Sequence, residues 1–235
     1  MDIQAPQGSS AKLTRAGAIP GGERCFASIV VLAAGRSTRF GRNKMLEPMG
    51  KTSLIEKVVS ESLGSKARQV IVVVGHAFEA MRSKLQGYAC EMVYNEEFES
   101  GQSSSVRKGV SRVSGRADAV MILPGDMVLM ERSIIDAVID EYDRTRAPIV
   151  NAGYQGSQGH PILFDRSLFG ELAGIAEPTR GLKAVVARHS AEVVTVETSP
   201  GAVLDMDTPG DLARLAEVSP GGRAETSGSH RRPRN

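Results

Sequence analysis

Residues 28–35 read SIVVLAAG, a short run of β-branched and aliphatic side chains that stops at Gly35. A run of this length, closed by a glycine, predicts a strand that is buried on both faces. Residues 36–44 follow it and read RSTRFGRNK. Four basic side chains therefore come directly after the end of the strand: Arg36, Arg39, Arg42 and Lys44.

The rest of the chain alternates between short apolar runs and helical patterns. We expect further strands at residues 70–74, 91–94, 119–123, 148–151, 161–164 and 192–196. We expect helices at residues 53–63, 78–85, 103–113, 133–143 and 181–188, and from Thr208 onward. This alternation predicts an α/β fold, a doubly wound and mostly parallel sheet with helices on both faces. Ligands of such sheets bind at the carboxyl ends of the strands, so the loops there are the candidates for chemistry.

Composition excludes several classes of protein. The chain has 235 residues, of which 41% are hydrophobic, and no apolar run approaches the ~18 residues of a membrane-spanning helix. Two cysteines, Cys25 and Cys90, do not make a disulfide framework. A net charge of +2 and an aromatic content of 4% without tryptophan argue against a nucleic-acid binder. We therefore expect a cytoplasmic protein that binds neither a membrane nor a nucleic acid.

The two ends of the chain differ from its body. Residues 1–24 and 219–235 show no apolar periodicity, and they predict flexible tails around one domain at residues 25–218. The first tail contains no apolar run of the length that a secretory signal needs. The basic excess of the chain falls in these tails, so the body is mildly acidic. A basic loop inside an acidic body calls for an explanation.

The loop at residues 35–44 combines glycines with cations. Gly35 and Gly41 let backbone amides approach an anion closely, and the four basic side chains suit a triphosphate. The loop is neither a Walker A sequence nor a GxGxxG sequence, which disfavours a P-loop ATPase and a dinucleotide dehydrogenase. From these residues alone, a phosphate site and an exposed basic loop explain the pattern equally well.

Motifs further along the chain favour the phosphate site. The loop resembles the signature LAAGxSxRMGxxK of nucleotidyltransferases related to the molybdenum-cofactor enzymes, the MobA-like NTP transferase family, with Phe40 in place of methionine. Four more segments match motifs of that family in the same order, and together the five matches extend from Leu32 to Leu212. These segments are Asn95 with GQSSS at residues 101–105, LPGD at 123–126, GHP at 159–161 and DMDTPGDL at 205–212.

The resemblance implies a Rossmann-like nucleotidyltransferase fold. It also implies transfer of a nucleotide from an NTP to a phosphate-bearing acceptor, with release of pyrophosphate. That reaction depends on charge neutralisation and in-line positioning. By the resemblance, Arg39, Lys44 and Asp126 are catalytic, and Asp126 and Asp207 bind Mg²⁺ or Mn²⁺. Asp205 is the weaker candidate for the metal. The residues implied to bind the substrates, the nucleotide for all but His160 and the acceptor for His160, are Leu32, Ala33, Ala34, Gly35, Arg36, Ser37, Asn95, Gln102, Ser103, Ser104 and His160.

Three of these residues have structural alternatives. Asp126 follows Pro-Gly and can stabilise a turn, and Asp207 can do the same before the last helix. His160 can order its loop by hydrogen bonding instead of contacting a substrate.

The resemblance also implies the substrates. LAAG at residues 32–35 stands where guanylyl-transferring relatives carry LAGG, which implies CTP. The implied acceptor is molybdopterin, with a client molybdo-hydroxylase or its chaperone as a further partner. The acceptor-side motifs depart from the family, because Met127-Val128 follow Asp126, and Lys183, with Arg180, is the aligned cation. A sugar phosphate or another phosphorylated small molecule therefore stays open as acceptor, as does a nucleotide-binding chaperone without turnover.

Overall fold

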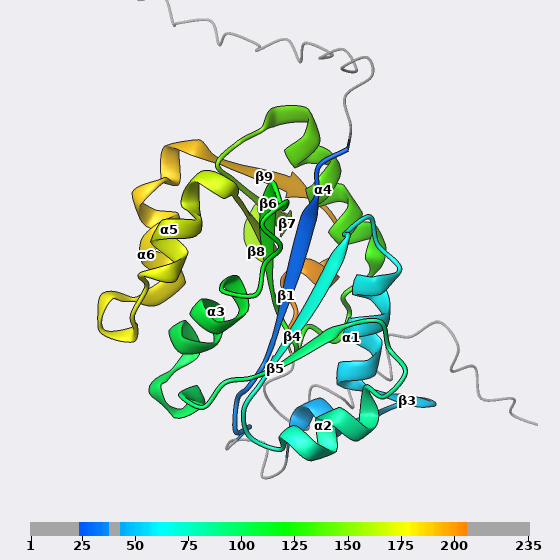
Figure 1. Cartoon of the computed structure of the whole chain (residues 1–235). Coiled ribbons are helices and arrows are strands. Elements are labelled where there is room, and N and C mark those ends of the chain that lie inside the picture. Colours follow the sequence, from blue (N-terminus) through cyan, green and yellow to red (C-terminus); the bar gives the residue numbers. More distant parts are fainter. Residues whose placement is uncertain (1–23, 38–42, 206–235) are drawn as a thin grey trace, which may run out of the picture.

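The computed structural model describes residues 24–37 and 43–205, and its centre is a seven-stranded sheet (Figure 1). The strands lie in the order β5-β4-β1-β6-β8-β7-β9. Their bounds are β1 Ala27–Ala33, β4 Gln69–Val74, β5 Glu91–Tyr94, β6 Ala119–Pro124, β7 Ile149–Tyr154, β8 Ser157–Asp165 and β9 Val193–Glu197. A separate two-stranded sheet pairs β2 (Pro48–Met49) with β3 (Thr52–Ser53).

The sheet is mostly parallel, as the sequence predicts. β1 pairs in parallel with β4 and with β6, β4 with β5, and β7 with β9. Only β8 runs the other way among the seven strands of the described sheet, and it pairs antiparallel with both β6 and β7. The chain builds β1, β4 and β5 in one direction and then returns to place β6 on the other side of β1. The order of strands therefore reverses between β1 and β6, which is where ligands of doubly wound sheets bind.

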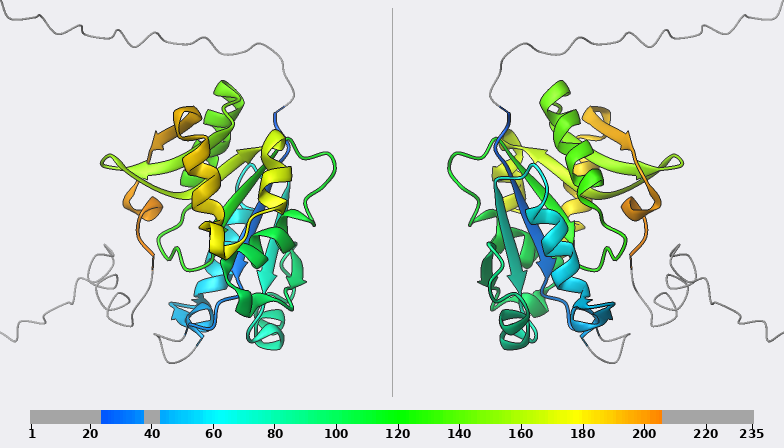
Figure 2. Two further views of the ribbon diagram at one scale, coloured as in Figure 1. Left: turned by 90° about the vertical axis from the view of Figure 1, so that its left-hand side faces the viewer. Right: turned by 90° about the vertical axis from the view of Figure 1, so that its right-hand side faces the viewer.

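Helices cover both faces of this sheet (Figures 1 and 2). One face carries α1, α2 and α4, and the other carries α3, α5 and α6. Their bounds are α1 Leu54–Leu63, α2 Phe78–Lys84, α3 Gln102–Val110, α4 Arg132–Thr145, α5 Phe169–Ala173 and α6 Gly181–Arg188. The predicted doubly wound α/β architecture is therefore confirmed.

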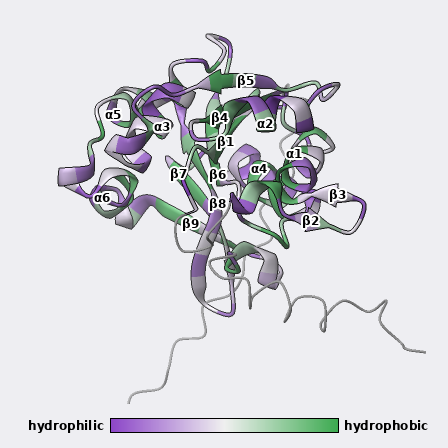
Figure 3. Ribbon diagram, turned by 90° about the horizontal axis from the view of Figure 1, so that it is seen from below, coloured by the Kyte–Doolittle hydropathy of each residue, from purple (hydrophilic) through white to green (hydrophobic). Residues whose placement is uncertain are grey.

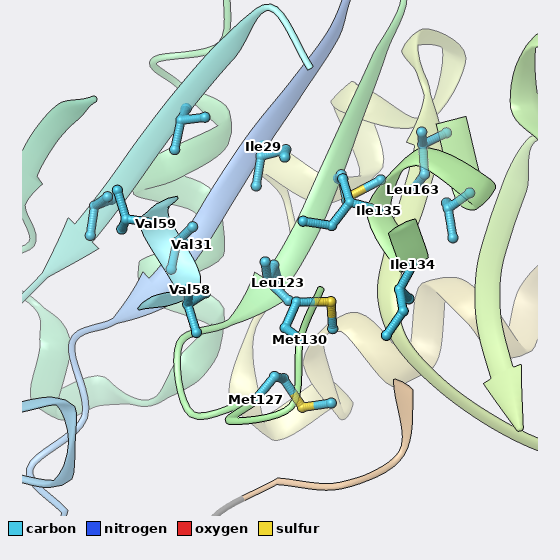
Figure 4. Close-up of a cluster of buried hydrophobic side chains, with 14 of the residues drawn as sticks. Ile29, Val31, Val58, Val59, Leu123, Met127, Met130, Ile134, Ile135 and Leu163 are labelled. Carbon is cyan, nitrogen blue, oxygen red and sulfur yellow. The ribbon is translucent and has the colours of Figure 1, made fainter. Parts of the chain in front are cut away.

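The core consists of two apolar layers, one on each side of the sheet. Ile29 and Val31 of β1 pack in the layer under α1 and α4, and Val30 and Leu32 pack in the opposite layer. Figure 4 shows the first layer, in which these strand residues meet Ile135 and other side chains of the helices. Alternate residues of a strand point to opposite faces, so a strand covered on both sides is apolar throughout. This is why residues 29–34 form an unbroken apolar run.

Local differences from the expected elements have local causes. The helix expected to extend to residue 113 ends at Val110, and Ser111 caps it. The expected short strands at residues 148–151 and 161–164 are the longer β7 and β8, joined at Gln155 and Gly156. Both turn residues have positive φ, 50° and 78°, as a two-residue hairpin turn requires. The sequence did not predict α5, β2 or β3, which are too short to carry a period.

Some expectations fall outside the described residues. These are the two tails, the central part of the basic loop with Arg39, the segment with Asp207, and the helix from Thr208. Within residues 24–37 and 43–205, no helix is both long and apolar enough to cross a membrane.

Candidate active site

The loops after β1 and β6 lie side by side at the carboxyl edge of the sheet. Leu32 pairs with Pro124 at the end of the two strands, and the Gly125 amide donates a hydrogen bond to the Leu32 carbonyl at 2.9 Å. A Cβ at Gly125 would lie 3.0 Å from the same carbonyl oxygen, so glycine allows this close approach. Figure 3 looks onto this edge of the molecule. The register therefore brings the residue after Gly125 next to the basic loop.

Lys44 and Asp126 meet at this point. The Lys44 Nζ lies 2.6 Å from Asp126 Oδ2, and the two side chains are 14% and 18% exposed. Lys44 begins the short helix η2 (Lys44–Leu46), and the Asn43 side chain caps that helix by accepting from the Met45 amide. The structure thus brings together two of the three residues predicted to be catalytic. The third, Arg39, lies outside the described residues.

The first part of the basic loop continues straight from the buried strand. Leu32, Ala33 and Ala34 are buried, and Gly35 and Arg36 are exposed. Ser37 has a positive φ of 52°, and its buried Oγ has no hydrogen-bond partner among the described residues. A loop that exposes its glycine and leaves a hydroxyl unsatisfied can receive an anion through its backbone amides.

Arg36 contacts a second loop rather than Asp126. Its guanidinium forms an ion pair with Glu99 and lies 5.7 Å from the centre of the Phe98 ring. Both partners belong to the short helix η3 (Phe98–Ser100), which follows β5. Phe98 in turn packs so closely on Gly75 that a Cβ there would overlap it. Arg36 therefore links the loop after β1 with the loops after β4 and β5.

Asn95 and Ser104 form the framework of the loop between β5 and α3. The Asn95 side-chain amide donates to Ser104 Oγ at 2.9 Å and to Ser105 Oγ at 3.1 Å. Ser104 Oγ donates in turn to the carbonyls of Glu97 and Gly101. Asn95 and Ser104 are both buried. In this structure their polar groups are satisfied within the loop, so their direct role is to shape the start of α3.

Gln102 and Ser103, in contrast, line a pocket of about 390 Å³. The pocket lies between the first turn of α3 and the first turn of α6, and Glu177, Arg180 and Lys183 line its other side. Ser103 is 3% exposed, and its Oγ has no hydrogen-bond partner among the described residues. The Ser103 amide donates to the Glu177 carboxylate at 2.6 Å.

His160 reaches the site because β8 runs antiparallel. Ile162 pairs with Ile122, so His160 lies beside the carboxyl end of β6, where the charge of Asp126 acts on its ring. Burial lowers the pKa of His160, although the nearby carboxylates of Asp126 and Asp205 act in the opposite direction. The buried Nδ1 has no hydrogen-bond partner among the described residues. A neutral imidazole with an unsatisfied nitrogen can, depending on its tautomer, accept a hydrogen bond from a substrate or donate one to it.

The chain after β9 returns to this histidine. The short helix η7 (Pro200–Ala202) packs so closely on β8 that a Cβ at Gly159 would overlap the Ala202 carbonyl. This contact carries Asp205 to the neighbourhood of His160, where its charge acts on the imidazole. Asp205 is therefore closer to the site than the sequence suggested. One signal for Asp205 was its spacing of two residues from Asp207, which puts both side chains on one face of an extended segment.

The carboxylates suit a divalent cation of the magnesium type, which prefers hard oxygen ligands and retains water. Asp126 is partly exposed, so a cation can reach it. Residues 24–37 and 43–205 contain no group of three or more His, Cys, Asp or Glu side chains that could hold a metal by themselves. Asp207, the second predicted ligand, lies outside those ranges.

The comparisons with known proteins identify the family. The model of the MobA-like NTP transferase domain matches residues 29–193. The chain belongs to the MobA-like NTP transferase family. Its MobA-like domain includes β1, β6 and the loops that follow them.

Individual relatives of this MobA-like chain include curated and solved proteins. The bifunctional protein GlmU of Francisella tularensis subsp. novicida is 28% identical over 152 residues, which are 64% of this chain and 32% of GlmU. The chain thus spans about a third of the length of such curated relatives. Rv0371c of Mycobacterium tuberculosis is 30% identical, with a TM-score of 0.71 over 83% of this chain and 99% of that chain. A manganese complex of Rv0371c is 28% identical with a TM-score of 0.67, over 83% and 100% of the two chains.

Proposed function

We propose that this nucleotidyltransferase transfers a cytidylyl group from CTP to a phosphate-bearing acceptor and releases pyrophosphate. The proposed acceptor is molybdopterin, and the product is the cytosine dinucleotide form of the molybdenum cofactor. The observation that carries the proposal is the Lys44–Asp126 pair, held where the strand order reverses. A cation and a carboxylate at that place supply the two charges that phosphoryl chemistry uses.

The residues of the loop after β1 hold the triphosphate. Backbone amides from Gly35 to Ser37 donate to the phosphate oxygens, and Lys44 and Arg39 neutralise the charge that develops on the α-phosphate and on the leaving pyrophosphate. The Lys44 ammonium group is already held at the site by its ion pair with Asp126, so only a short movement brings it to the phosphates. His160 orders the acceptor side of the site through its unsatisfied nitrogen.

Asp126 and Asp207 are the proposed ligands of Mg²⁺ or Mn²⁺. When bound, such a cation supplies charge neutralisation between the α-phosphate and the acceptor. The manganese complex of Rv0371c supports a divalent cation in this family. We place this chemistry in the cytoplasm, because both described cysteines are free thiols. The proposed client is a molybdo-hydroxylase or its chaperone.

The choice of CTP over GTP rests on Ala34. This residue is buried at the end of β1, where guanylyl-transferring relatives carry a glycine. A methyl group near the edge of the base leaves less room for a purine than a glycine does. We therefore propose that Ala34 excludes the larger base.

A second acceptor class is favoured by residues 127–128. Met127 and Val128 are buried in the apolar core beside α4. They therefore present no polar group to an acceptor. This is the position after Asp126 at which the sequence departs from the family's acceptor-side motif. A sugar phosphate or another phosphorylated small molecule is the alternative acceptor.

The decisive experiment measures pyrophosphate release by the full chain with CTP, GTP and ATP, each with a panel of phosphorylated acceptors. We expect release with CTP and molybdopterin. Equal turnover with GTP would contradict the base assignment, and turnover with a sugar phosphate but not with molybdopterin would establish the second candidate. No release with any pair would contradict the proposed activity.

A further inference from the structure

The loop after β6 is held in place by side chains of one helix. Residues 125–131 form this loop, which joins β6 to α4. The Lys57 ammonium of α1 donates to the Val128 carbonyl in the loop at 2.6 Å. The Glu61 carboxylate of α1 accepts from the Arg132 amide, directly after the loop, at 2.8 Å. Because Lys57 and Glu61 are one helical turn apart, they lie on the same face of α1 and fix the loop at two places.

The contact of Lys57 is uncommon for a lysine. Its side chain is half-buried, and it forms no ion pair with a carboxylate among the described residues. Instead it provides a partner for a backbone oxygen at Val128, which is fully buried. A charged donor makes a stronger hydrogen bond to a carbonyl than a neutral donor does. The bond therefore fixes the backbone two residues after Asp126.

The same helix is joined to the segment of Lys44. The Leu54 amide, at the first residue of α1, donates to the Glu47 carbonyl at 3.0 Å, and the Glu47 amide donates to the Lys44 carbonyl at 3.2 Å. Met45 lies against the start of the loop after β6, since a Cβ at Gly125 would lie 3.2 Å from its sulfur. The helix α1 is therefore a common support for Lys44 and for that loop.

Apolar packing adds to this support, and Asp126 is outside it. Met127 and Met130 of the loop are buried in the same apolar layer as Val58 of α1 (Figure 4). The Asp126 side chain is partly exposed, and its carboxylate accepts from Lys44 at 2.6 Å. The backbone next to Asp126 is thus held by the protein core and by Lys57, whereas its carboxylate faces the candidate site.

We propose that Lys57 is a positioning residue, which keeps Asp126 in place when Lys44 leaves it. This inference rests on the proposed function. In the structure, the ion pair with Lys44 restrains the Asp126 carboxylate. In the proposed reaction Lys44 turns to the phosphates and Asp126 binds the divalent cation, so this restraint is lost when the carboxylate has to be fixed most precisely. Lys57 is not exchanged in this way, because it bonds to a backbone oxygen.

The test is titration calorimetry of the full chain with α,β-methylene-CTP, in which a carbon replaces the oxygen between the α- and β-phosphates. Each protein is titrated with and without Mg²⁺, and the ratio of the two affinities measures the coupling between the cation and the nucleotide. Lys57→Met keeps the length of the side chain and removes the donor. We expect this ratio to fall about tenfold, and the affinity without Mg²⁺ to stay at the wild-type value.

Lys66→Met is the matched control. The Lys66 ammonium pairs with Asp140 of α4 at 2.5 Å, so it also connects to α4, but away from the carboxyl edge of the sheet. The ratio should stay at the wild-type value in this variant, and the melting temperature of both methionine variants should fall by no more than a few degrees. An equal loss of the ratio in Lys66→Met, or a weaker affinity without Mg²⁺ in Lys57→Met, would show a general structural effect and overturn the proposal.

Two further variants test whether Lys57 acts through its hydrogen bond and through Asp126. Lys57→Arg keeps a charged donor and should restore most of the ratio. Asp126→Asn should remove the coupling by itself, and adding Lys57→Met to it should change the ratio no further. An arginine variant as impaired as the methionine variant, or a further loss in the double variant, would overturn the proposal.

Hydrogen exchange gives a second readout that does not depend on the cation assignment. With the analogue and Mg²⁺ bound, amides of residues 125–131 should exchange faster in Lys57→Met than in the wild type. The difference should be smaller in the free protein, where the ion pair between Lys44 and Asp126 also restrains the loop. Equal exchange in the two bound proteins would overturn the proposal.

The variants also separate this inference from the proposed function. A wild-type ratio in Asp126→Asn would contradict the proposed metal ligand, and the exchange measurement would then decide whether Lys57 holds the loop. Loss of coupling in Asp126→Asn, together with a wild-type ratio in Lys57→Met, would overturn this inference alone.

Discussion

At the scale of single residues, the site depends on contacts between distant parts of the chain. Lys44 and Asp126 are 82 positions apart, and Ser103 and Glu177 are 74 positions apart. The sequence motifs predicted Lys44, Asp126 and Ser103 one by one. Glu177 carries no such signal, because its role comes from a contact with a backbone amide, and amides are the same in every residue except proline. Glu99, the partner of Arg36, was missed for a similar reason.

Asp126→Asn should abolish turnover and leave the fold intact. We expect pyrophosphate release to fall by at least about a hundredfold, since the carboxylate is the proposed metal ligand and its amide is a much poorer one. The melting temperature should stay within a few degrees of the wild type, because the side chain lies at the surface end of β6.

The control for this prediction is Asp140→Asn. Asp140 forms a similar pair with Lys66 at 2.5 Å, away from the carboxyl edge of the sheet. Turnover should be unchanged in this variant. A rate for Asp126→Asn near that of the control would show that Asp126 is not a metal ligand.

His189 should make stability depend on pH. Its ring lies 3.0 Å from Glu192 and 2.9 Å from Glu171, and hydrogen bonds to these two carboxylates raise the pKa of His189 above its ordinary value. A raised pKa in the folded state favours folding while the ring is protonated. The contribution is therefore complete below the unfolded pKa of about 6.5 and disappears as the pH rises through the folded value.

Urea denaturation of the wild type and of His189→Gln checks this expectation. The wild type should be the more stable of the two near pH 6, and the difference should shrink toward pH 9. A difference that grows with pH would contradict the assignment.

At the scale of elements, prediction succeeded where a segment carries its own signal. The helix predicted from the capping pattern at Ser53 is α1, and the Glu56 carboxylate accepts from both the Ser53 amide and the Ser53 hydroxyl. The strand at residues 28–32 is β1, because burial on both faces demands an unbroken apolar run. β7 and β8 were predicted too short, because Gly153 and Gly159 interrupt the apolar pattern in their outer halves. Glycine is present at both positions because other segments of the same chain approach the backbone closely there.

Glu56→Ala should lower the free energy of unfolding by about 1 kcal/mol at neutral pH, through loss of the contacts at the start of α1. Hydrogen bonding to Ser53 holds the pKa of Glu56 below its ordinary value. The contribution is thus present above the unfolded pKa and is lost as the pH falls through the folded one. Chemical denaturation at pH 7 and near pH 3 measures both effects.

Glu79→Ala is the element-scale control. Glu79 lies in the first turn of α2, and its exposed carboxylate pairs with Arg82. Its loss should change stability by a few tenths of a kcal/mol. If Glu56→Ala were no more destabilising than Glu79→Ala, the contacts at Ser53 would contribute nothing.

At the scale of the whole molecule, the architecture follows from the order in which strands are added. The sequence predicted the alternation of strands and helices, and hence the layers, but the position of β8 between β6 and β7 depends on pairing between segments that are far apart. That pairing decides where His160 and Asp205 lie. The motifs located the candidate site at the carboxyl edge, and the strand order determined which of its residues are neighbours.

The rates of amide hydrogen exchange should follow the position of each strand in the sheet, slowest at the centre and fastest at the edges. Amides of β1, which pairs with β4 and β6 under both core layers, should exchange most slowly, and those of the edge strands β5 and β9 should exchange much faster. Mass spectrometry of peptides from the exchanged protein measures this gradient. Exchange in β9 as slow as in β1 would contradict the described sheet.

The stack of Arg36 on Phe98 on Gly75 makes the site accessible to optical measurement. The chain contains no tryptophan, so Phe98→Trp would place a single emitting indole under the guanidinium of the loop after β1. Phe98 is half-buried and lines a pocket of about 670 Å³ on the side away from the backbone contact, so the larger ring has room. Any ligand that draws Arg36 away from this ring would change the colour or the brightness of the emission. One natural contact would then report, in real time and without an attached dye, when the phosphate loop is occupied.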